Sequence, residues 1–268
     1  MMPEETVRKP RRWELLRAGF TNWPLPAALA FLDYRSNRLW PGRITAIGNL
    51  RCQLRARDGA RLVARVRDVN APAEVFGRDE YGHAGIDWSR VEYVLDLGGH
   101  VGSFTLWAAE RSPARFFVVE PNPAVFELLE RNVRALGERV TLKQAAVAGE
   151  AGEGWFAQDI DSASSRLTVA EPTGGLRVRT VSLAQVFAES GFPRVDLVKM
   201  DVEGAEYPAL RAAEADLLRA ARHWVIECHP GADGDADDVA GLFEAAGFET
   251  VVAVKPDRLA LVTANRRD

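Results

Sequence analysis

The sequence has few of the features that would tie the chain to a membrane, a disulfide framework or a metal cage. Its 268 residues include only two cysteines, Cys52 and Cys228, which are too few for a disulfide framework and lack the neighbours of a zinc site. No apolar run approaches the roughly 18 residues that cross a bilayer. The basic N-terminal stretch is not followed by the apolar segment of a secretory signal. We therefore expect a cytoplasmic protein without a membrane span.

The chain also lacks an excess of basic residues. It has 34 Lys and Arg against 38 Asp and Glu, a net charge of -4. Such a balance gives no general attraction to the phosphate backbone of a nucleic acid. The hydrophobic fraction of 47% is that of a globular chain with a full-sized core. We expect no nucleic-acid partner and no polyanionic substrate, and the sequence leaves the oligomeric state open.

The pattern of the sequence changes near residue 90 and so divides the chain into two regions. Residues 1–90 begin with a segment rich in Trp and Pro. In the stretch 51–66, apolar residues alternate with polar ones on both sides of Asp58-Gly59, which is the pattern of a β-hairpin. We expect an N-terminal extension with helical and hairpin elements over residues 1–90 and a second domain over residues 91–268.

Residues 91–268 predict an α/β fold. Apolar runs that end in polar residues alternate there with helical stretches. Such runs suit strands buried on both faces, hence a mostly parallel sheet with helices on each side. Residues 249–266 read as two strands joined by a turn at 255–258, so we expect an antiparallel C-terminal hairpin at the sheet edge. In sheets of this kind a ligand binds at the carboxyl ends of the strands.

The first strand of this region leads into a glycine-rich turn. Asp96, Gly98 and Gly102 fit the pattern D-x-G-x-x-x-G, whereas the dinucleotide pattern G-x-G-x-x-G fails because position 97 is Leu. A carboxylate at position 96 repels a pyrophosphate and attracts an ammonium or sulfonium group. Glycines let the backbone approach a ligand, and the N–H groups of the following helix can hold a carboxylate. S-adenosylmethionine carries all of these groups.

An acidic residue follows the second strand at the spacing of a ribose-binding carboxylate. Glu120 lies 22 residues after Gly98, where it can accept hydrogen bonds from both ribose hydroxyls. Asn122 assists it, and Ala146, near the end of the third strand, contacts the adenine. The predicted cofactor-binding residues are Asp96, Gly98, Gly99, His100, Gly102, Glu120, Asn122 and Ala146.

These motifs resemble those of the FkbM-type methyltransferases, a branch of the S-adenosylmethionine-dependent superfamily. The resemblance covers about residues 60–250 and rests on VLDLGGHVGSFT, on VVEPNPAVFELLERN, and on VDLVKMDVEGAE followed by VIECH. It implies a Rossmann-like seven-stranded sheet and transfer of a methyl group to a hydroxyl of a small molecule, a sugar or a natural product. The chain departs from many relatives at Gly99-His100, where they have Ala-Asn.

The fourth and fifth strands of the region end in the residues that we assign to catalysis. Methyl transfer requires the protein to align the acceptor, exclude water and remove the hydroxyl proton. We assign the general base to His229, whose unperturbed pKa of about 6.5 lets it accept a proton at neutral pH. Asp201 orients His229 or the acceptor. Lys199, on the same strand face, pairs with Asp201 or polarises the acceptor. The N-terminal extension would cover the acceptor.

Three alternatives stay open. The first is a divalent cation that lowers the pKa of the hydroxyl, for which suitable ligands are Asp201, Glu203, Glu227 and His229. We favour a site without metal because clustered acids more often cap helices or pair with Arg. Glu206, at a helix start, needs no role beyond such capping. An N-methyltransferase would typically carry an Asn/Asp-Pro-Pro-aromatic turn after the fourth strand, which is absent. The third alternative is a non-catalytic module that binds S-adenosylmethionine.

Other polar residues are weaker candidates for contacts with the acceptor. His83 and the polar loop 159–166 could reach an acceptor, although loop residues of this kind are more often solvated connectors. His223 and Trp107 are expected to be structural.

Overall fold

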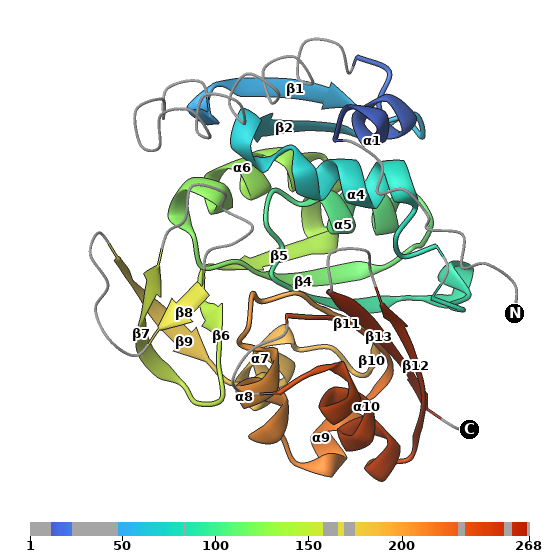
Figure 1. The fold of residues 1–268 in the computed structure, drawn as a ribbon, viewed down its shortest axis with the longest axis vertical. Helices are drawn as coiled ribbons and strands as arrows, with labels where there is room; N and C mark the ends of the chain where they lie inside the picture. Colours follow the sequence, from blue (N-terminus) through green and yellow to red (C-terminus); the bar gives the residue numbers. More distant parts are fainter. Residues whose placement is uncertain are drawn as a thin grey trace, which may run out of the picture.

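A seven-stranded sheet forms the centre of the computed structural model, which describes residues 12–22, 48–82, 84–157, 166–168, 175–229, 234–254 and 259–266 (Figure 1). The strand order is β12-β13-β11-β10-β3-β4-β5. The strands from β11 to β5 pair in parallel, whereas β13 pairs antiparallel with both β11 and β12. This is the Rossmann-like methyltransferase sheet, and the predicted antiparallel hairpin at its edge is confirmed. The turn predicted at 255–258 lies outside the described residues.

The strands follow the continuous apolar runs of the sequence. In β10 all six residues are buried, because helices cover both faces of the sheet. The strand bounds are β3 (Tyr93–Leu97), β4 (Arg115–Val119), β5 (Val140–Lys143), β10 (Val195–Met200), β11 (Ala221–Cys228), β12 (Phe248–Val254) and β13 (Ala260–Arg266).

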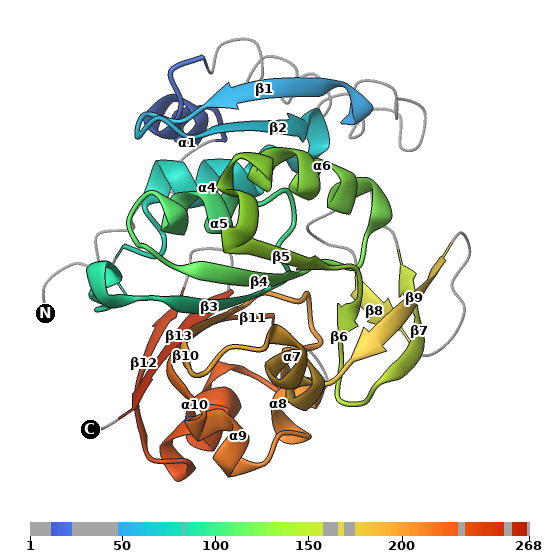
Figure 2. The same ribbon diagram turned by 180° about the vertical axis from the view of Figure 1, so that it is seen from behind.

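The helices lie in two layers, one on each face of the sheet, as Figures 1 and 2 show from opposite sides. One layer contains α4 (Asn70–Arg78), α5 (Ser103–Ala109) and α6 (Pro123–Val133), and the other contains α7 (Leu183–Ser190), α8 (Glu206–Arg211), α9 (Ala215–Arg219) and α10 (Ala236–Ala245). Three short 3-10 helices complete the described segments: η1 (Val66–Asp68), η2 (Trp88–Arg90) and η3 (Arg134–Arg139). Trp107 of α5 is fully buried in the core beneath the first layer, and Trp224 of β11 is fully buried in the core beneath the second. No helix among the described residues is long and apolar enough to cross a membrane.

The N-terminal region forms an outer layer over α4 and α6 (Figure 2). It contains α1 (Arg12–Gly19) and the predicted hairpin, in which β1 (Arg51–Arg55) pairs antiparallel with β2 (Arg61–Arg65). Asn132 of α6 ties this hairpin to the main domain, because its side chain accepts from the Val63 N–H at 2.7 Å and donates to the Val63 carbonyl at 2.9 Å. The hairpin, α4 and the sheet therefore share one continuous hydrophobic core.

A second sheet, which the sequence analysis did not predict, lies beside the main one. It is inserted between β5 and α7 and has the order β6-β9-β7-β8. Its strands are β6 (Ala146–Val147), β7 (Gly152–Ala157), β8 (Arg166–Thr168) and β9 (Leu176–Val181). We call it the accessory sheet. Because β6 follows β5 after two residues, the accessory sheet lies at the carboxyl end of the main sheet (Figure 1).

Candidate active site

A cavity that opens to solvent lies where the parallel strands end. The turn after β3 contributes Gly98 and His100, the end of β4 contributes Glu120, and the turn after β10 contributes Asp201 and Glu203. The accessory sheet contributes Ala146, Val147 and Phe156. The cavity therefore brings together residues from three strand ends that the sequence analysis assigned to the cofactor and to catalysis.

The glycine turn is shaped by a close approach of two backbones. Gly98 has a φ of +81°, and a Cβ at this position would lie 1.7 Å from the carbonyl oxygen of Asp201. Only glycine fits there, because both the conformation and the space exclude a side chain. Gly102 has a different role, since it does not line the cavity and a Cβ on it would press on Leu129 and Val133 of α6 at 3.1 Å.

Asp96 lies beneath this turn rather than on the cavity wall. Its carboxylate is fully buried, accepts a hydrogen bond from the Thr105 hydroxyl at 2.6 Å and lies 3.2 Å from the Lys199 ammonium. Lys199 also donates to the Gly98 carbonyl at 2.6 Å, whereas Asp201 is 4.0 Å away. Burial lowers the pKa of Lys199, but the charges of Asp96 and Asp201 raise it above its ordinary value, so the ammonium stays charged. Of the two carboxylates, Asp96 is therefore the closer partner of Lys199.

Glu120 is a buried acidic residue at the cavity wall. It is 6% exposed, and its two oxygens accept from the backbone N–H groups of His100 at 3.0 Å and Asn122 at 2.8 Å. Burial raises the pKa of Glu120. A carboxylate has about four lone-pair sites, so acceptor capacity remains for a ligand. The Asn122 side chain does not line the cavity but caps α6 by accepting from the Ala124 N–H.

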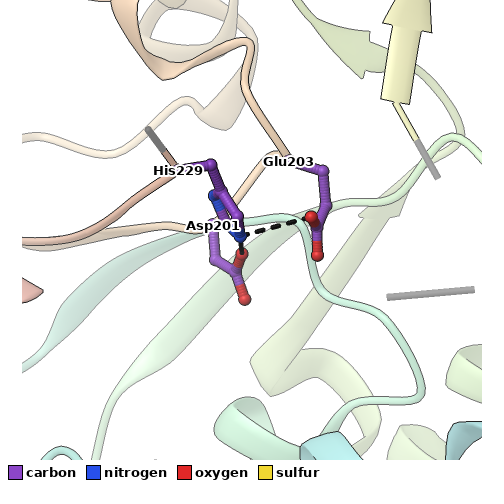
Figure 3. A group of neighbouring side chains, drawn as sticks. All are labelled: Asp201, Glu203 and His229. Atoms are coloured by element: carbon purple, nitrogen blue, oxygen red, sulfur yellow. Dashed lines mark ion pairs between the residues drawn. The ribbon is translucent and has the colours of Figure 1, made fainter. Parts of the chain in front are cut away.

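A cluster of three ionisable side chains lies at the ends of β10 and β11 (Figure 3). His229 Nε2 is 3.2 Å from a Glu203 carboxylate oxygen and 4.0 Å from an Asp201 oxygen. The cluster arises because β10 and β11 are neighbours in the sheet, which places their carboxyl ends side by side. The structure thus brings Asp201 and His229 together, as expected from adjacent strand ends.

Glu206 contacts the other nitrogen of the His229 ring. It is fully buried and lies 3.0 Å from His229 Nδ1, and it accepts from the backbone N–H groups of Val202 and Gly204. The sequence analysis assigned Glu206 only to helix capping. The signal for a larger role was present in the dense acidic spacing of Asp201, Glu203 and Glu206, but the sequence does not show which acid meets the histidine.

The charges of this cluster differ from the expectation for His229. Burial lowers the pKa of His229, but the bond to Glu206 and the charges of Asp201 and Glu203 raise it to about 10. Burial, and next the charge of Asp201, raise the pKa of Glu203 to about 9. The expectation of a near-neutral pKa for His229 is therefore corrected, because its carboxylate neighbours keep the ring protonated at neutral pH.

The same three side chains have the spacing of a cation site. One ligand atom from each of Asp201, Glu203 and His229 lies within 4.8 Å of the others. A histidine must be neutral to ligate a metal, so a cation at this site would have to displace the proton that the carboxylate neighbours favour on His229. Glu227, the fourth ligand that was considered, lines a different cavity.

This second cavity adjoins the first and shares Ala71, Gly98, His100 and Asp201 with it. One wall comes from α4 and the turn after it, with Glu74 and Tyr81 among the lining residues. The N-terminal region therefore takes part in the site. His83 and residues 159–165 lie outside the described residues, whereas His223 contacts the Asn265 side chain at 2.6 Å, away from both cavities.

The comparison with known families agrees with this architecture. Residues 96–250 match the family described as the methyltransferase FkbM domain. Since the match covers more than half of the chain, the protein belongs to this family of S-adenosylmethionine-dependent methyltransferases.

Individual relatives are distant. The chain is 29% identical to the 31-O-demethyl-FK506 methyltransferase FkbM of Streptomyces tacrolimicus, over 68% of this chain and 82% of that protein. It is 28% identical to the AMB antimetabolite synthetase AmbE of Pseudomonas aeruginosa, over 69% of this chain but only 11% of the synthetase. Among solved structures, an O-methyltransferase family protein from Burkholderia thailandensis is 14% identical with a TM-score of 0.47, over 76% of this chain and 60% of that chain.

Proposed function

We propose that the protein transfers the methyl group of S-adenosylmethionine to a hydroxyl oxygen of a small molecule or sugar. The observation that carries this proposal is that one cavity is lined both by Glu120 and by the pair Asp201 and Glu203. An acid placed to bind a ribose and a cluster able to accept a proton thus line the same cavity. The name of the FK506 relative, which specifies an oxygen acceptor, supports the same reading.

The residues fit this cofactor on two observations. Glu120 is a buried carboxylate with acceptor capacity left over, which suits the two hydroxyls of a ribose. Gly98 presents only backbone to the cavity, because its close approach to the Asp201 carbonyl leaves no room for a Cβ. When bound, S-adenosylmethionine supplies a methyl group made electrophilic by the sulfonium. The turn at 98–100 would hold its amino-acid part, and Ala146 would contact its adenine.

Asp201 is the residue that we propose to take the hydroxyl proton. At neutral pH His229 already holds a proton, and Glu203 lines only the main cavity, whereas Asp201 lines both. A positioned base of this kind contributes typically 10²–10⁴-fold to the rate. His229 then acts as a fixed cation that orients the side chains of Asp201 and Glu203, and Glu206 fixes the orientation of the ring. The proposed base is therefore Asp201 rather than His229.

The acceptor would enter beside the N-terminal region. Residues 1–90 supply one wall of the second cavity through Glu74 of α4 and Tyr81 of the turn that follows it. We therefore assign residues 91–268 to the methyltransferase domain and the preceding region to one side of the acceptor pocket.

A binding and turnover experiment tests this function. We expect S-adenosylmethionine and S-adenosylhomocysteine to bind the purified protein in a calorimeter, and a set of hydroxylated sugars and natural products to include a methyl acceptor. The position of the new methyl group, read by NMR, must be on oxygen. Methyl transfer to nitrogen would establish the N-methyltransferase alternative, and binding without transfer to any acceptor would favour the non-catalytic module.

A further inference from the structure

The accessory sheet places an aromatic ring on the wall of the main cavity. Phe156 lies on β7, is 7% exposed and lines the cavity together with Ala146 and Val147 of β6. Trp155, the preceding residue on the strand, points to the opposite face because side chains alternate along a strand. Phe156 is thus the aromatic residue that β7 directs at the cavity.

The polar residues of the cavity determine which part of a ligand this ring can meet. Glu120 fixes the ribose, and the transferable methyl group must face the acid cluster at Asp201 for the proton to be removed. The adenine then occupies the remaining part of the wall. That part is apolar, since the other lining residues are Ala71, Val119, Pro121, Phe156, Val202 and residues 145–147. A flat heteroaromatic ring suits such a wall better than a hydrated acceptor does.

We propose that Phe156 is a cofactor-binding residue whose ring packs against the adenine of S-adenosylmethionine. This inference rests on the proposed function, because it takes the cavity to be the cofactor site. It gives the accessory sheet a role in binding, since Phe156 is the only Phe, Tyr or Trp among the described residues that line this cavity.

The surroundings of Phe156 offer a matched control. Phe156 pairs with Leu176 across β7 and β9 and packs in a small cluster with Ala146 and Val178. Val178 is as buried as Phe156, but it does not line the cavity. A change at Val178 therefore disturbs the same packing without removing a contact with the ligand.

The test is calorimetric titration of S-adenosylhomocysteine into wild type, Phe156→Ala, Phe156→Leu and Val178→Ala. Base–aromatic stacking is lost in the first variant, so we expect its Kd to rise about tenfold. Phe156→Leu keeps apolar bulk without the ring and should fall between Phe156→Ala and wild type. Val178→Ala should bind within about twofold of wild type, even where its melting temperature falls.

Three outcomes would overturn the inference. The first is an unchanged Kd for Phe156→Ala, and the second is an equal loss in Val178→Ala, which would make the effect one of packing. The third is an effect confined to the KM of the acceptor. A wild-type protein that binds no S-adenosylhomocysteine would instead refute the proposed function.

Discussion

The two sides of the cavity are built differently. At the ends of β3 and β4 it is lined by backbone and by one acid that is hydrogen-bonded to backbone N–H groups, whereas at the ends of β10 and β11 ionisable side chains contact one another. Glu120 accepts two N–H groups of the main chain, but His229 contacts the side chains of Glu203 and Glu206. The first arrangement is rigid and suits a constant ligand. The second couples several charges, so a change at one residue alters the protonation of the others.

This contrast predicts that the largest effect will come from the backbone side. Gly98→Ala places a Cβ 1.7 Å from the Asp201 carbonyl and imposes a φ of +81° on an alanine. We expect S-adenosylhomocysteine binding to be lost and the melting temperature to fall. Gly59→Ala is the control, since Gly59 has a φ of +105° but nothing within 4 Å of the new Cβ. It should lose only the conformational term of roughly 1–2 kcal/mol and keep its affinity. Equal behaviour of the two variants would contradict the close-approach argument.

On the charged side, Asp201→Asn should affect the rate and leave cofactor affinity intact. Removing the proposed base should lower kcat by about 10²–10⁴-fold, measured with an acceptor found in the turnover screen. The affinity for S-adenosylhomocysteine should stay within about twofold. Asp216→Asn, at a side chain that is 92% exposed, provides the control. Turnover that survives in Asp201→Asn and disappears in His229→Ala would return the base to His229.

Glu120→Gln tests the side of the cavity at the ends of β3 and β4, where we expect cofactor affinity rather than rate to change. The amide replaces an acceptor-only group that binds two backbone N–H groups and, by our proposal, two ribose hydroxyls. We expect the Kd for S-adenosylmethionine to rise about tenfold, in line with charged hydrogen bonds, while kcat at saturation changes little. The exposed Glu127→Gln on α6 should behave as wild type. A loss of kcat without a change in Kd would place Glu120 in the chemistry instead.

The coupled charges also predict how stability depends on pH. The folded pKa of His229, about 10, lies above its ordinary value of 6.5, so its contribution is complete below pH 6.5 and is lost as the pH rises toward 10. Glu203, raised to about 9, acts in the same direction between pH 4.5 and 9. The free energy of unfolding in urea should therefore fall between pH 7 and 10. Glu203→Gln should flatten this decline, and an unchanged slope would argue against the coupling.

The smallest effect is expected from removal of metal ions. We expect turnover to be the same before and after dialysis against a chelator, because the proposed base, Asp201, accepts the hydroxyl proton without the help of a cation. Loss of turnover that Mg²⁺ or Mn²⁺ restores would establish the cation alternative at Asp201, Glu203 and His229.

Much of the fold could be predicted from the sequence because the signals are local. The alternation around Asp58-Gly59 predicted the β1–β2 hairpin, and the continuous apolar runs predicted the parallel sheet. The accessory sheet could not be predicted in this way. β9 alternates apolar and basic residues, but β7 contains two glycines and lacks such alternation, and residues 158–175 separate the two strands. Phe156 therefore gave no signal of lining a cavity.

By itself the sequence determined the family, the order of the strands along the chain and the residue types at their ends, since turns, apolar runs and spacing depend on neighbouring residues. Only the tertiary structure decided which of these residues meet. It paired Lys199 more closely with Asp96 than with Asp201 and placed Glu206 against His229. The protonation of His229 follows from that placement, because a pKa depends on the burial and charges that folding assembles around a group.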